Sequence, residues 1–265
     1  MVKFFSKKAA LFIPPYYFFK HIHTQIITCS PCYNLDMKGT LIVIDGTDGS
    51  GKATQVALLK KRLENDGHTV HTMDFPRYYD NFFGGFIGEC LKGDHGDWAG
   101  TNPKIASVIY AADRYESSHH IKEWLQQGHI VILDRYVSSN QIHQGGKIND
   151  DDKRREFIAW LDTMEHEVFD IPRPDAILYL DVSVAITQKL LKTKGNKESK
   201  KYLKGQGDQH ENNVEHLEAA RESGLKMIAQ NNNWIRVECS QDGRIFSIED
   251  IHETIYKKVK TILSE

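Results

Sequence analysis

Residues 46–52 read G-T-D-G-S-G-K, which has the spacing G-x-x-x-x-G-K of a phosphate-binding loop, or P-loop. Glycines at these places let the backbone turn so that successive N–H groups converge on phosphate oxygens. Lys52 can reach the β- and γ-phosphates, and a helix that begins near this lysine turns its positive end toward them. The motif therefore predicts that the phosphates of a nucleotide are bound by Gly46, Gly49, Ser50, Gly51, Lys52, Ala53 and Thr54, although a P-loop alone does not separate nucleotide kinases from GTPases, ATPases or motor domains.

Position 53 departs from the usual P-loop, in which Ser or Thr follows the lysine and offers a hydroxyl to Mg²⁺. Here that residue is Ala53, and Thr54 is turned by about 100° around the helix. The sequence therefore predicts phosphate binding but lacks the usual metal ligand.

Three arginines favour a second anion site. Arg77 and Arg135 each follow an apolar run that is expected to be a strand, and Arg114 lies within a long helical pattern. A lone arginine is most often a solvated surface residue. Arginine also suits planar, multidentate phosphate recognition, and two of these three stand at strand ends that face the P-loop.

A lysine-rich segment spans residues 189–204, with seven lysines against one acid, Glu198. A solvated, mobile charge run is the simplest interpretation. A lid that closes over phosphates is the alternative, in which one or two of Lys192, Lys194, Lys197 and Lys201 would contact them.

The elements that position these residues form an alternating pattern. Short apolar runs rich in β-branched residues predict five buried strands, at 40–45, 69–74, 129–134, 176–181 and 234–238. Amphipathic patterns predict helices at 53–65, 103–127, 152–169, 214–231 and 247–263. This alternation favours an α/β fold with a five-stranded parallel sheet and helices on both faces. Ligands bind beyond the carboxyl ends of such strands, and four of the five runs end on aspartate: Asp45, Asp74, Asp134 and Asp181.

Composition excludes several classes of function. The 265 residues carry a formal net charge of -2, which gives no global attraction to nucleic acid or to an anionic membrane. Four cysteines are too few for a disulfide scaffold in a chain of this length, which favours a reducing compartment such as the cytoplasm. No apolar run is long enough to span a membrane, because Pro14 and Pro15 interrupt the longest candidate.

The first 36 residues differ from the rest. They contain four lysines and no acid before Asp36, which allows a targeting peptide, and they include the C-x-x-C pair Cys29 and Cys32. No second Cys/His pair at zinc-finger spacing accompanies that pair, which disfavours a metal or redox site. Met37 begins the sequence M-K-G-T-L-I-V-I-D-G, which reads like the start of a domain. We expect a poorly ordered extension at 1–36 and one P-loop domain at 37–265, with a lid at about 189–211.

Taken together, these motifs resemble the thymidylate kinases, a family of P-loop nucleoside monophosphate kinases. The resemblance rests on I-D-G-T-D-G-S-G-K-A-T-Q (44–55), F-P-R-Y (75–78), L-K-G-D-H-G-D (91–97), A-A-D-R (111–114), I-L-D-R-Y-V-S-S-N (132–140), P-D-A-I-L-Y-L-D (174–181) and D-Q-H-E (208–211). They occur in family order over about residues 37–263. The resemblance implies phosphoryl transfer from ATP to dTMP, giving ADP and dTDP for dTTP synthesis, with Mg²⁺ as cofactor. It also implies a homodimer formed through helices.

The resemblance also implies roles for individual residues. Lys52, Arg135, Asp48 and Asp134 would be catalytic, and Asp48 and Asp134 would lie near the metal. The dTMP site would comprise Asp48, Phe75, Arg77, Tyr110, Arg114, Arg135, Asn140 and His143. In that site Arg135 and Arg77 would contact the phosphate, Phe75 and Tyr110 would enclose the thymine, and Arg114 and Asn140 would meet its edge. Asp208 and Glu211 resemble the D-x-x-E that orders the lid.

His143 stands where many family members have a tyrosine that presses against the sugar, which leaves the preference for deoxyribose open. Two alternatives also stay open. The chain could be another nucleotide or deoxynucleoside kinase of the same fold, or a P-loop switch protein that hydrolyses ATP slowly. Dependence of ADP release on an acceptor nucleotide distinguishes them.

Overall fold

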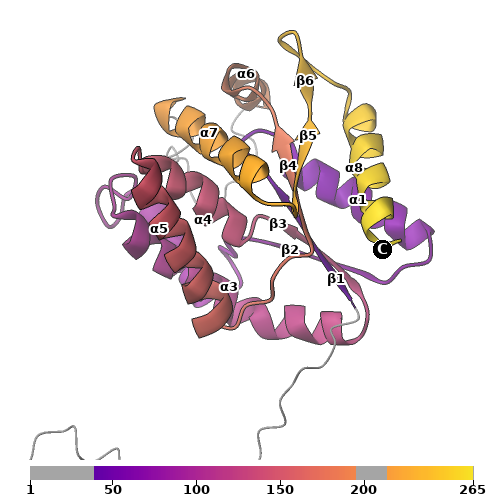
Figure 1. The fold of residues 1–265 in the computed structure, drawn as a ribbon, viewed down its shortest axis with the longest axis horizontal. Helices are drawn as coiled ribbons and strands as arrows, with labels where there is room; N and C mark the ends of the chain where they lie inside the picture. The colour runs from indigo at the N-terminus through magenta and orange to yellow at the C-terminus, as the bar shows by residue number, and fades with distance from the viewer. Residues whose placement is uncertain (1–38, 195–213, 265) are drawn as a thin grey trace, which may run out of the picture. The chain divides into compact units, whose positions relative to one another are not determined.

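The computed structural model describes residues 39–194 and 214–264. Within these ranges lies a five-stranded parallel sheet with the order β2-β3-β1-β4-β5 (Figure 1). Its strands are β1 (Thr40–Asp45), β2 (Val70–Asp74), β3 (Ile130–Asp134), β4 (Ala176–Asp181) and β5 (Trp234–Glu238). The sequence-based strands and their parallel pairing are confirmed, with β2 and β3 each starting one residue later than expected.

Helices cover both faces of the sheet (Figure 1). On one face lie α1 (Lys52–Asn65) and α8 (Ile248–Ile262), and on the other lie α3 (Pro103–Gln126), α4 (Val137–His143), α5 (Asp151–Asp162) and α7 (Val214–Gln230). Alternate residues of β1 enter the two cores: Leu41 and Val43 pack toward the face of α3, and Ile42 and Ile44 toward the face of α1 and α8. A sheet buried on both faces explains why its strands read as continuous apolar runs.

The expected helix 152–169 is wrong as a single regular helix. The α-helix α5 ends at Asp162, and a π-helical turn, η3 (Thr163–Val168), continues the chain. The N–H of Phe169 donates to the carbonyl of Met164 at 3.0 Å, five residues back, which is the hydrogen bond of a wide turn. Apolar periodicity continues through the turn, so the pattern alone could not show it.

Several short elements lack a clear sequence signal. They are α2 (Phe82–Lys92), α4, the 3-10 turn η2 (Gly145–Lys147), α6 (Val184–Lys194) and a hairpin of β6 (Ser240–Gln241) and β7 (Arg244–Ile245). Glycines weaken the helical pattern of α2. One of them is needed for packing, because a Cβ on Gly84 would lie 2.0 Å from the carbonyl oxygen of Arg77.

Within residues 39–194 and 214–264, no helix is long and apolar enough to cross a membrane.

Candidate active site

The P-loop connects β1 to α1 at the carboxyl edge of the sheet. Its glycines take backbone angles that disfavour other residues: φ is 150° at Gly46, 81° at Gly49 and 93° at Gly51. A Cβ on Gly46 would also lie 2.8 Å from the carbonyl oxygen of Leu180. Gly51 is the N-cap of α1 and offers no side-chain cap, so the first N–H groups of the helix remain open to an anion.

Lys52 is buried and folds back over the loop. Its Nζ donates to the carbonyl oxygens of Gly46 at 3.1 Å and of Thr47 at 3.0 Å. Burial lowers the pKa of Lys52, and Arg135 lowers it further, whereas Asp48 and the strand-end carboxylates raise it. The ammonium group is thus held in a cluster of charges, on neutral acceptors that a phosphate oxygen can replace or supplement.

Two hydroxyls of the loop are buried without a hydrogen-bond partner among the described residues: Thr47 Oγ1 and Ser50 Oγ. Buried polar atoms normally have partners, and an unsatisfied one costs free energy. Both therefore suit a ligand rich in oxygen. Ala53 is exposed on the first turn of α1 and Thr54 is half-buried beside it.

Asp45, at the end of β1, holds the start of the P-loop through hydrogen bonds. Its buried carboxylate accepts the N–H of Gly46 at 2.8 Å, the hydroxyl of Ser138 at 2.5 Å and that of Ser139 at 2.9 Å. Both serines lie on α4, so Asp45 ties the start of the P-loop to the helix that follows β3. Nothing in the spacing of these serines singled them out.

Two of the other strand-end aspartates, Asp134 and Asp181, have different surroundings. Asp134 lies in the charge cluster: burial raises its pKa, and the opposing attraction comes from Lys52 and Arg135. Asp181 pairs with Arg221 at 2.7 Å and with Arg236 at 2.6 Å. It therefore has a structural role at the end of β4, whereas Asp134 belongs to the site.

Arg135 joins the two halves of the site. It forms an ion pair with Asp48 of the P-loop, and its Nη1 lies 3.2 Å from His143 Nε2. Burial alone would lower the pKa of Arg135, but Asp48 and neighbouring carboxylates outweigh burial and raise it. Its backbone φ of 67° is uncommon for a residue with a side chain, and such strained backbone is concentrated at functional sites.

His143 lies between Arg135 and α7. Because arginine can only donate, Nε2 of His143 must accept, which places the proton of a neutral ring on Nδ1. Nδ1 lies 3.4 Å from Nε2 of His216. The histidine expected near the sugar is therefore directly connected to the arginine expected at the phosphate.

Arg77 is held at the edge of the site. Its Nη2 lies 2.7 Å from Asp80, and its backbone N–H donates to Asp113 at 3.1 Å. Asp113 also accepts from the Asn81 side chain at 2.9 Å, so the aspartate of the A-A-D-R motif fastens the loop after β2 to α3. Burial raises the pKa of Asp113. This supporting role was not predicted.

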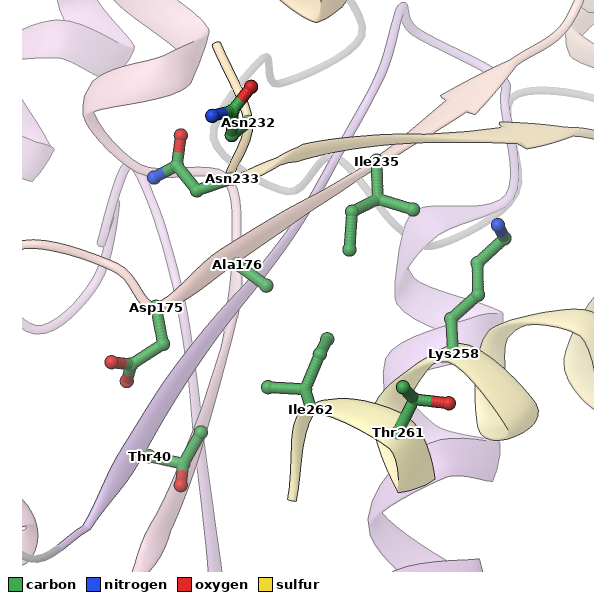
Figure 2. A pocket seen from close by; sticks show the side chains of 9 residues that line it. All are labelled: Thr40, Asp175, Ala176, Asn232, Asn233, Ile235, Lys258, Thr261 and Ile262. Carbon is green, nitrogen blue, oxygen red and sulfur yellow. The ribbon is translucent and has the colours of Figure 1, made fainter. Parts of the chain in front are cut away.

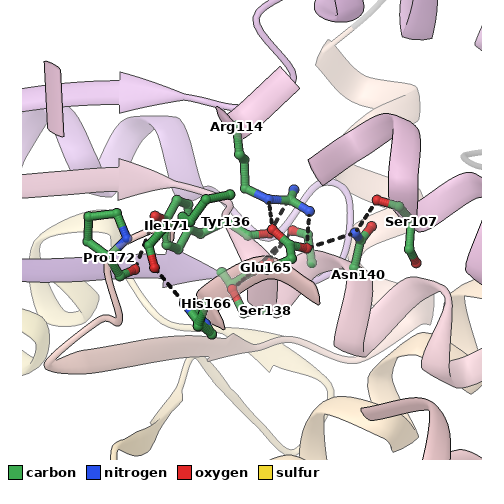
Figure 3. A network of polar contacts seen from close by, with 11 residues as sticks. Ser107, Arg114, Tyr136, Ser138, Asn140, Glu165, His166, Ile171 and Pro172 are labelled. Atoms are coloured by element: carbon green, nitrogen blue, oxygen red, sulfur yellow. Dashed lines mark hydrogen bonds and ion pairs between the residues drawn. The ribbon is translucent and has the colours of Figure 1, made fainter. Parts of the chain in front are cut away.

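Arg114 and Asn140 meet at a buried carboxylate that sequence reasoning missed, Glu165 of η3 (Figure 3). Arg114 Nε and Nη2 lie 2.7 and 2.5 Å from the two carboxylate oxygens, and Asn140 Nδ2 lies 3.3 Å from one of them. Burial works against the charge of Arg114, but Glu165 raises its pKa. In the sequence, Glu165 is one acid among many in an amphipathic stretch, and only its place four residues after the apolar Leu161 could have indicated a buried position.

The two aromatic residues expected around the base have different surroundings. Phe75 is buried and packs on Tyr136, with ring centroids 5.9 Å apart. Tyr110 is half-buried, and its hydroxyl accepts a hydrogen bond from Trp98 Nε1 at 3.2 Å. Trp98 follows the L-K-G-D-H-G-D stretch and is a further neighbour that sequence reasoning did not name.

Most of the segment expected to form the lid lies outside the described part of the chain. Lys192 and Lys194 lie in the last turn of α6, but their side chains are not described. Lys197, Lys201, Asp208 and Glu211 lie outside the described residues.

A pocket lies at the opposite, amino-terminal edge of the sheet (Figure 2). It is lined by the first residues of β1 and β4, by the start of β5 and by the end of α8. Because the P-loop follows the other end of β1, this pocket is separate from the charge cluster around Lys52.

The chain is similar to known proteins along most of its length. A family model described as thymidylate kinase matches residues 44–255. A probable thymidylate kinase of Thermococcus gammatolerans is 33% identical over 224 residues, which cover 82% of this chain and 94% of the relative. The thymidylate kinase of Mycobacterium tuberculosis (strain ATCC 25618 / H37Rv) is 34% identical over 146 residues, covering 55% of this chain and 67% of the relative.

A solved structure of a thymidylate kinase from Candida albicans has the same fold, with a TM-score of 0.63 and 22% identity over 84% of this chain and 92% of that one. The match of the family model, over residues 44–255, covers most of the chain. The chain therefore belongs to the thymidylate kinase family, whose enzymes transfer a phosphoryl group from ATP to dTMP and release ADP and dTDP.

Proposed function

We propose that the charge cluster of Lys52, Arg135 and Asp48 is the place where the γ-phosphoryl group of ATP passes to dTMP. The observation that carries this proposal is the Asp48–Arg135 ion pair, because it joins the P-loop to the end of β3. Phosphoryl transfer needs little covalent help from the protein. It needs donor and acceptor held in line and positive charge around the transferring group.

On the donor side, the open N-terminus of α1 and the amides of residues 49–53 bind the ATP phosphates. Lys52 leaves its present carbonyl acceptors, or adds a third, when it contacts the β- and γ-phosphate oxygens. The buried hydroxyls of Thr47 and Ser50 are satisfied by the ligand or by ordered water.

On the acceptor side, Arg135 clamps the dTMP phosphate and Arg77 adds a second contact. Both arginines are only partly buried, with side chains 17% and 21% exposed, so their carboxylate partners can be exchanged for phosphate oxygens. Arg114 and Asn140 meet the thymine edge, and Phe75 and Tyr110 enclose the ring. His143 lies against the sugar.

We propose Mg²⁺ as the cofactor. Its preferred ligands are oxygens, and it is usually held by one or two carboxylates together with substrate phosphates and water. Asp134 and Asp48 fit that description, because both belong to the cluster around Lys52 and Arg135. Ala53 offers no hydroxyl, so the two carboxylates are the protein ligands that we propose for Mg²⁺. When bound, Mg²⁺ neutralises charge on the transferring phosphates.

We propose that two copies associate through α3. Ile105, Val108 and Tyr115 of this helix are 62%, 39% and 55% exposed, and with the half-buried Ala112 they follow the spacing of one helical face. An exposed apolar stripe of this kind is typical of a helix that packs on a partner. Size-exclusion chromatography with light scattering should give the mass of a dimer, and Ile105→Asp should shift it to that of a monomer.

The catalytic domain that we propose spans 37–265, with an extension at 1–36 and a lid at about 189–211. Cys90 and Cys239 are buried and unpaired, which supports a reducing compartment such as the cytoplasm.

One assay tests the proposed function. ADP release from ATP and Mg²⁺ is measured with dTMP, dUMP, dCMP, UMP and thymidine as acceptors. We expect the largest kcat/KM with dTMP. A preference for thymidine would assign the chain to the deoxynucleoside kinases, and ADP release that does not depend on any acceptor would support a slow ATPase switch instead.

A further inference from the structure

Glu165 contacts both residues that are proposed to meet the base. It is fully buried in the π-helical turn η3, and its two oxygens face Arg114, while one of them also faces Asn140 (Figure 3). A buried charge needs a partner, and the bidentate pair with Arg114 supplies it. The additional contact to Asn140 goes beyond what charge compensation alone requires.

The contacts of Asn140 determine which way its amide points. Its Nδ2 lies 3.3 Å from the backbone carbonyl of Ser107 and 3.3 Å from Glu165 Oε1. Both neighbours can only accept hydrogen bonds, so the atom that faces them must be the NH₂ group. The amide oxygen therefore points away from Glu165 and remains as an acceptor for a ligand.

The contacts of Arg114 have the complementary effect. Nε and one hydrogen of Nη2 face Glu165, and one hydrogen of Nη1 faces the carbonyl of Tyr136 at 3.3 Å. A guanidinium has five N–H donors, so two remain without a partner among the described residues. Arg114 can thus offer only donors to a ligand, beside the acceptor of Asn140.

We propose that Glu165 is a positioning residue that determines base specificity, by fixing an acceptor on Asn140 and donors on Arg114. This inference rests on the proposed function of those two residues. A thymine edge offers an N3–H donor and an O4 acceptor and matches the pattern. A cytosine edge offers an N3 acceptor and an N4 amino donor, so it opposes the pattern at both places.

The test compares dTMP with 5-methyl-dCMP, which shares its phosphate, sugar and methyl group and differs only at the base edge. Unpaired buried polar groups discriminate strongly, so we expect the wild-type protein to favour dTMP by at least about 100-fold in kcat/KM. Equal use of the two nucleotides by the wild-type protein would overturn the proposal without any variant.

In Glu165→Gln, one carboxylate oxygen becomes an NH₂ group, so Asn140 Nδ2 keeps only the Ser107 carbonyl as a certain acceptor and Arg114 loses its charged partner. We expect the preference for dTMP over 5-methyl-dCMP to fall by about ten-fold or more, while KM for ATP stays within about two-fold. A merely structural role would lower activity with both nucleotides and leave their ratio unchanged, and that result would contradict the proposal.

Two further variants complete the test. Glu165→Asp keeps the charge opposite Arg114 but is one methylene shorter, so it should lose the Asn140 contact and lower the ratio about three-fold or more. If Glu165→Gln does not fold, this variant decides, and a ratio within two-fold of wild type overturns the proposal. Glu167→Gln, on the exposed side of the same turn, is the matched control and should change nothing.

The failures are distinguishable. A wild-type protein that does not phosphorylate dTMP refutes the proposed function, and the inference falls with it. A wild-type protein that strongly prefers dTMP, and keeps that preference in both Glu165 variants, refutes the inference alone.

Discussion

The proposed donor and acceptor sides of the site hold their positive charges in different ways. On the donor side, Lys52 donates to the neutral carbonyl oxygens of Gly46 and Thr47. On the acceptor side each arginine faces a carboxylate: Arg77 faces Asp80, Arg114 faces Glu165 and Arg135 faces Asp48. The donor side is thus arranged to receive an anion directly, whereas the acceptor side is already charge-balanced.

The acceptor-side pairs also differ from one another in burial. Arg114 and Glu165 are 2% and 0% exposed, so their pair cannot readily separate. The pairs of Arg77 and Arg135 retain access to solvent and can be exchanged. A buried pair suits the reading of an uncharged base, because it orients donors without offering net charge. An exchangeable pair suits phosphate binding.

The largest effect is expected from removing the donor-side charge. Lys52→Met should lower kcat by about 10² to 10³-fold, because a charge that stabilises the transition state in a preorganised site is lost. Steady-state kinetics should show KM for dTMP changed by less than about three-fold. Lys61→Met, exposed on the same helix, is the control. A similar increase in KM for ATP and for dTMP would contradict the division into a donor side and an acceptor side.

A smaller effect, confined to the acceptor side, is expected for Arg135→Ala. Charge-assisted hydrogen bonds to phosphate are worth about 1.5–3 kcal/mol, or about one to two powers of ten in kcat/KM for dTMP. ATP binding, measured by calorimetry, should weaken much less. Arg155→Ala on the exposed side of α5 controls for loss of charge. A variant that is globally unfolded, or that loses both nucleotides equally, would count against the clamp.

The lid would add a further source of donor-side charge. The interior of the P-loop, residues 48–50, carries no cation, and the segment 189–204 is the densest supply of lysine in the sequence. We expect single Lys→Ala changes at positions 192, 194, 197 and 201 to reveal at least one that lowers kcat about ten-fold with little change in Tm. If the quadruple variant kept its kcat, the segment would be only a solvated charge run.

Lys147 tests whether a buried charge outside these pairs affects stability. Its Nζ is buried without a hydrogen-bond partner among the described residues, and burial lowers its pKa to about 8, although Asp97 opposes the shift. Below pH 8 the folded protein carries a poorly solvated charge. Between about pH 8 and the unfolded value of about 10.4, only the unfolded chain keeps the proton, so stability contributed at this site rises with pH.

Lys147→Met should therefore raise Tm by about 2 °C at pH 7, and the gain should fade toward pH 10. Thermal unfolding at both pH values measures it, with the exposed Lys153→Met as control. A gain that persists at pH 10 would show that packing, not charge, is responsible.

The smallest effect is expected for Ala53→Ser. If carboxylates such as Asp134 provide the protein ligands for Mg²⁺, a new hydroxyl should leave kcat nearly unchanged or lower the Mg²⁺ concentration needed for activity. A Mg²⁺ titration of the wild-type and variant proteins measures this. A severe loss would mean that Ala53 makes room for another group, and that the metal site differs from the one proposed.

The elements with long apolar runs were predictable from sequence. The strands that end at Asp45 and Asp134 are buried on both faces, so their composition shows them without reference to distant residues. The P-loop was predictable for a similar reason, because its function depends on backbone angles that glycine supplies locally.

The supporting residues of the site could not be predicted, because tertiary contacts define them. Glu165 is 51 residues from Arg114 in the chain, and Asp45 is 93 residues from Ser138. An acid in an amphipathic helix pattern usually faces solvent. Glu165 lies four residues after the buried Leu161, within the π-helical turn, and its carboxylate enters the interior to meet Arg114. The spacing of the motifs predicted a set of substrate-binding residues, but it did not indicate Glu165 and Asp45, which contact several of them or the loop beside them.

The Asp48–Arg135 pair has a consequence for how the binding of one substrate changes the affinity for the other. In the proposed site, a dTMP phosphate bound to Arg135 would release Asp48 from its ion pair with the arginine, and ATP with Mg²⁺ bound to Asp48 would release Arg135. Each substrate thus removes a competitor of the other. By linkage, the factor by which dTMP tightens ATP binding must equal the factor by which ATP tightens dTMP binding. We expect positive cooperativity between ATP and dTMP. The complexes that hold only one of the two nucleotides should then be less populated than they would be if the two sites were independent.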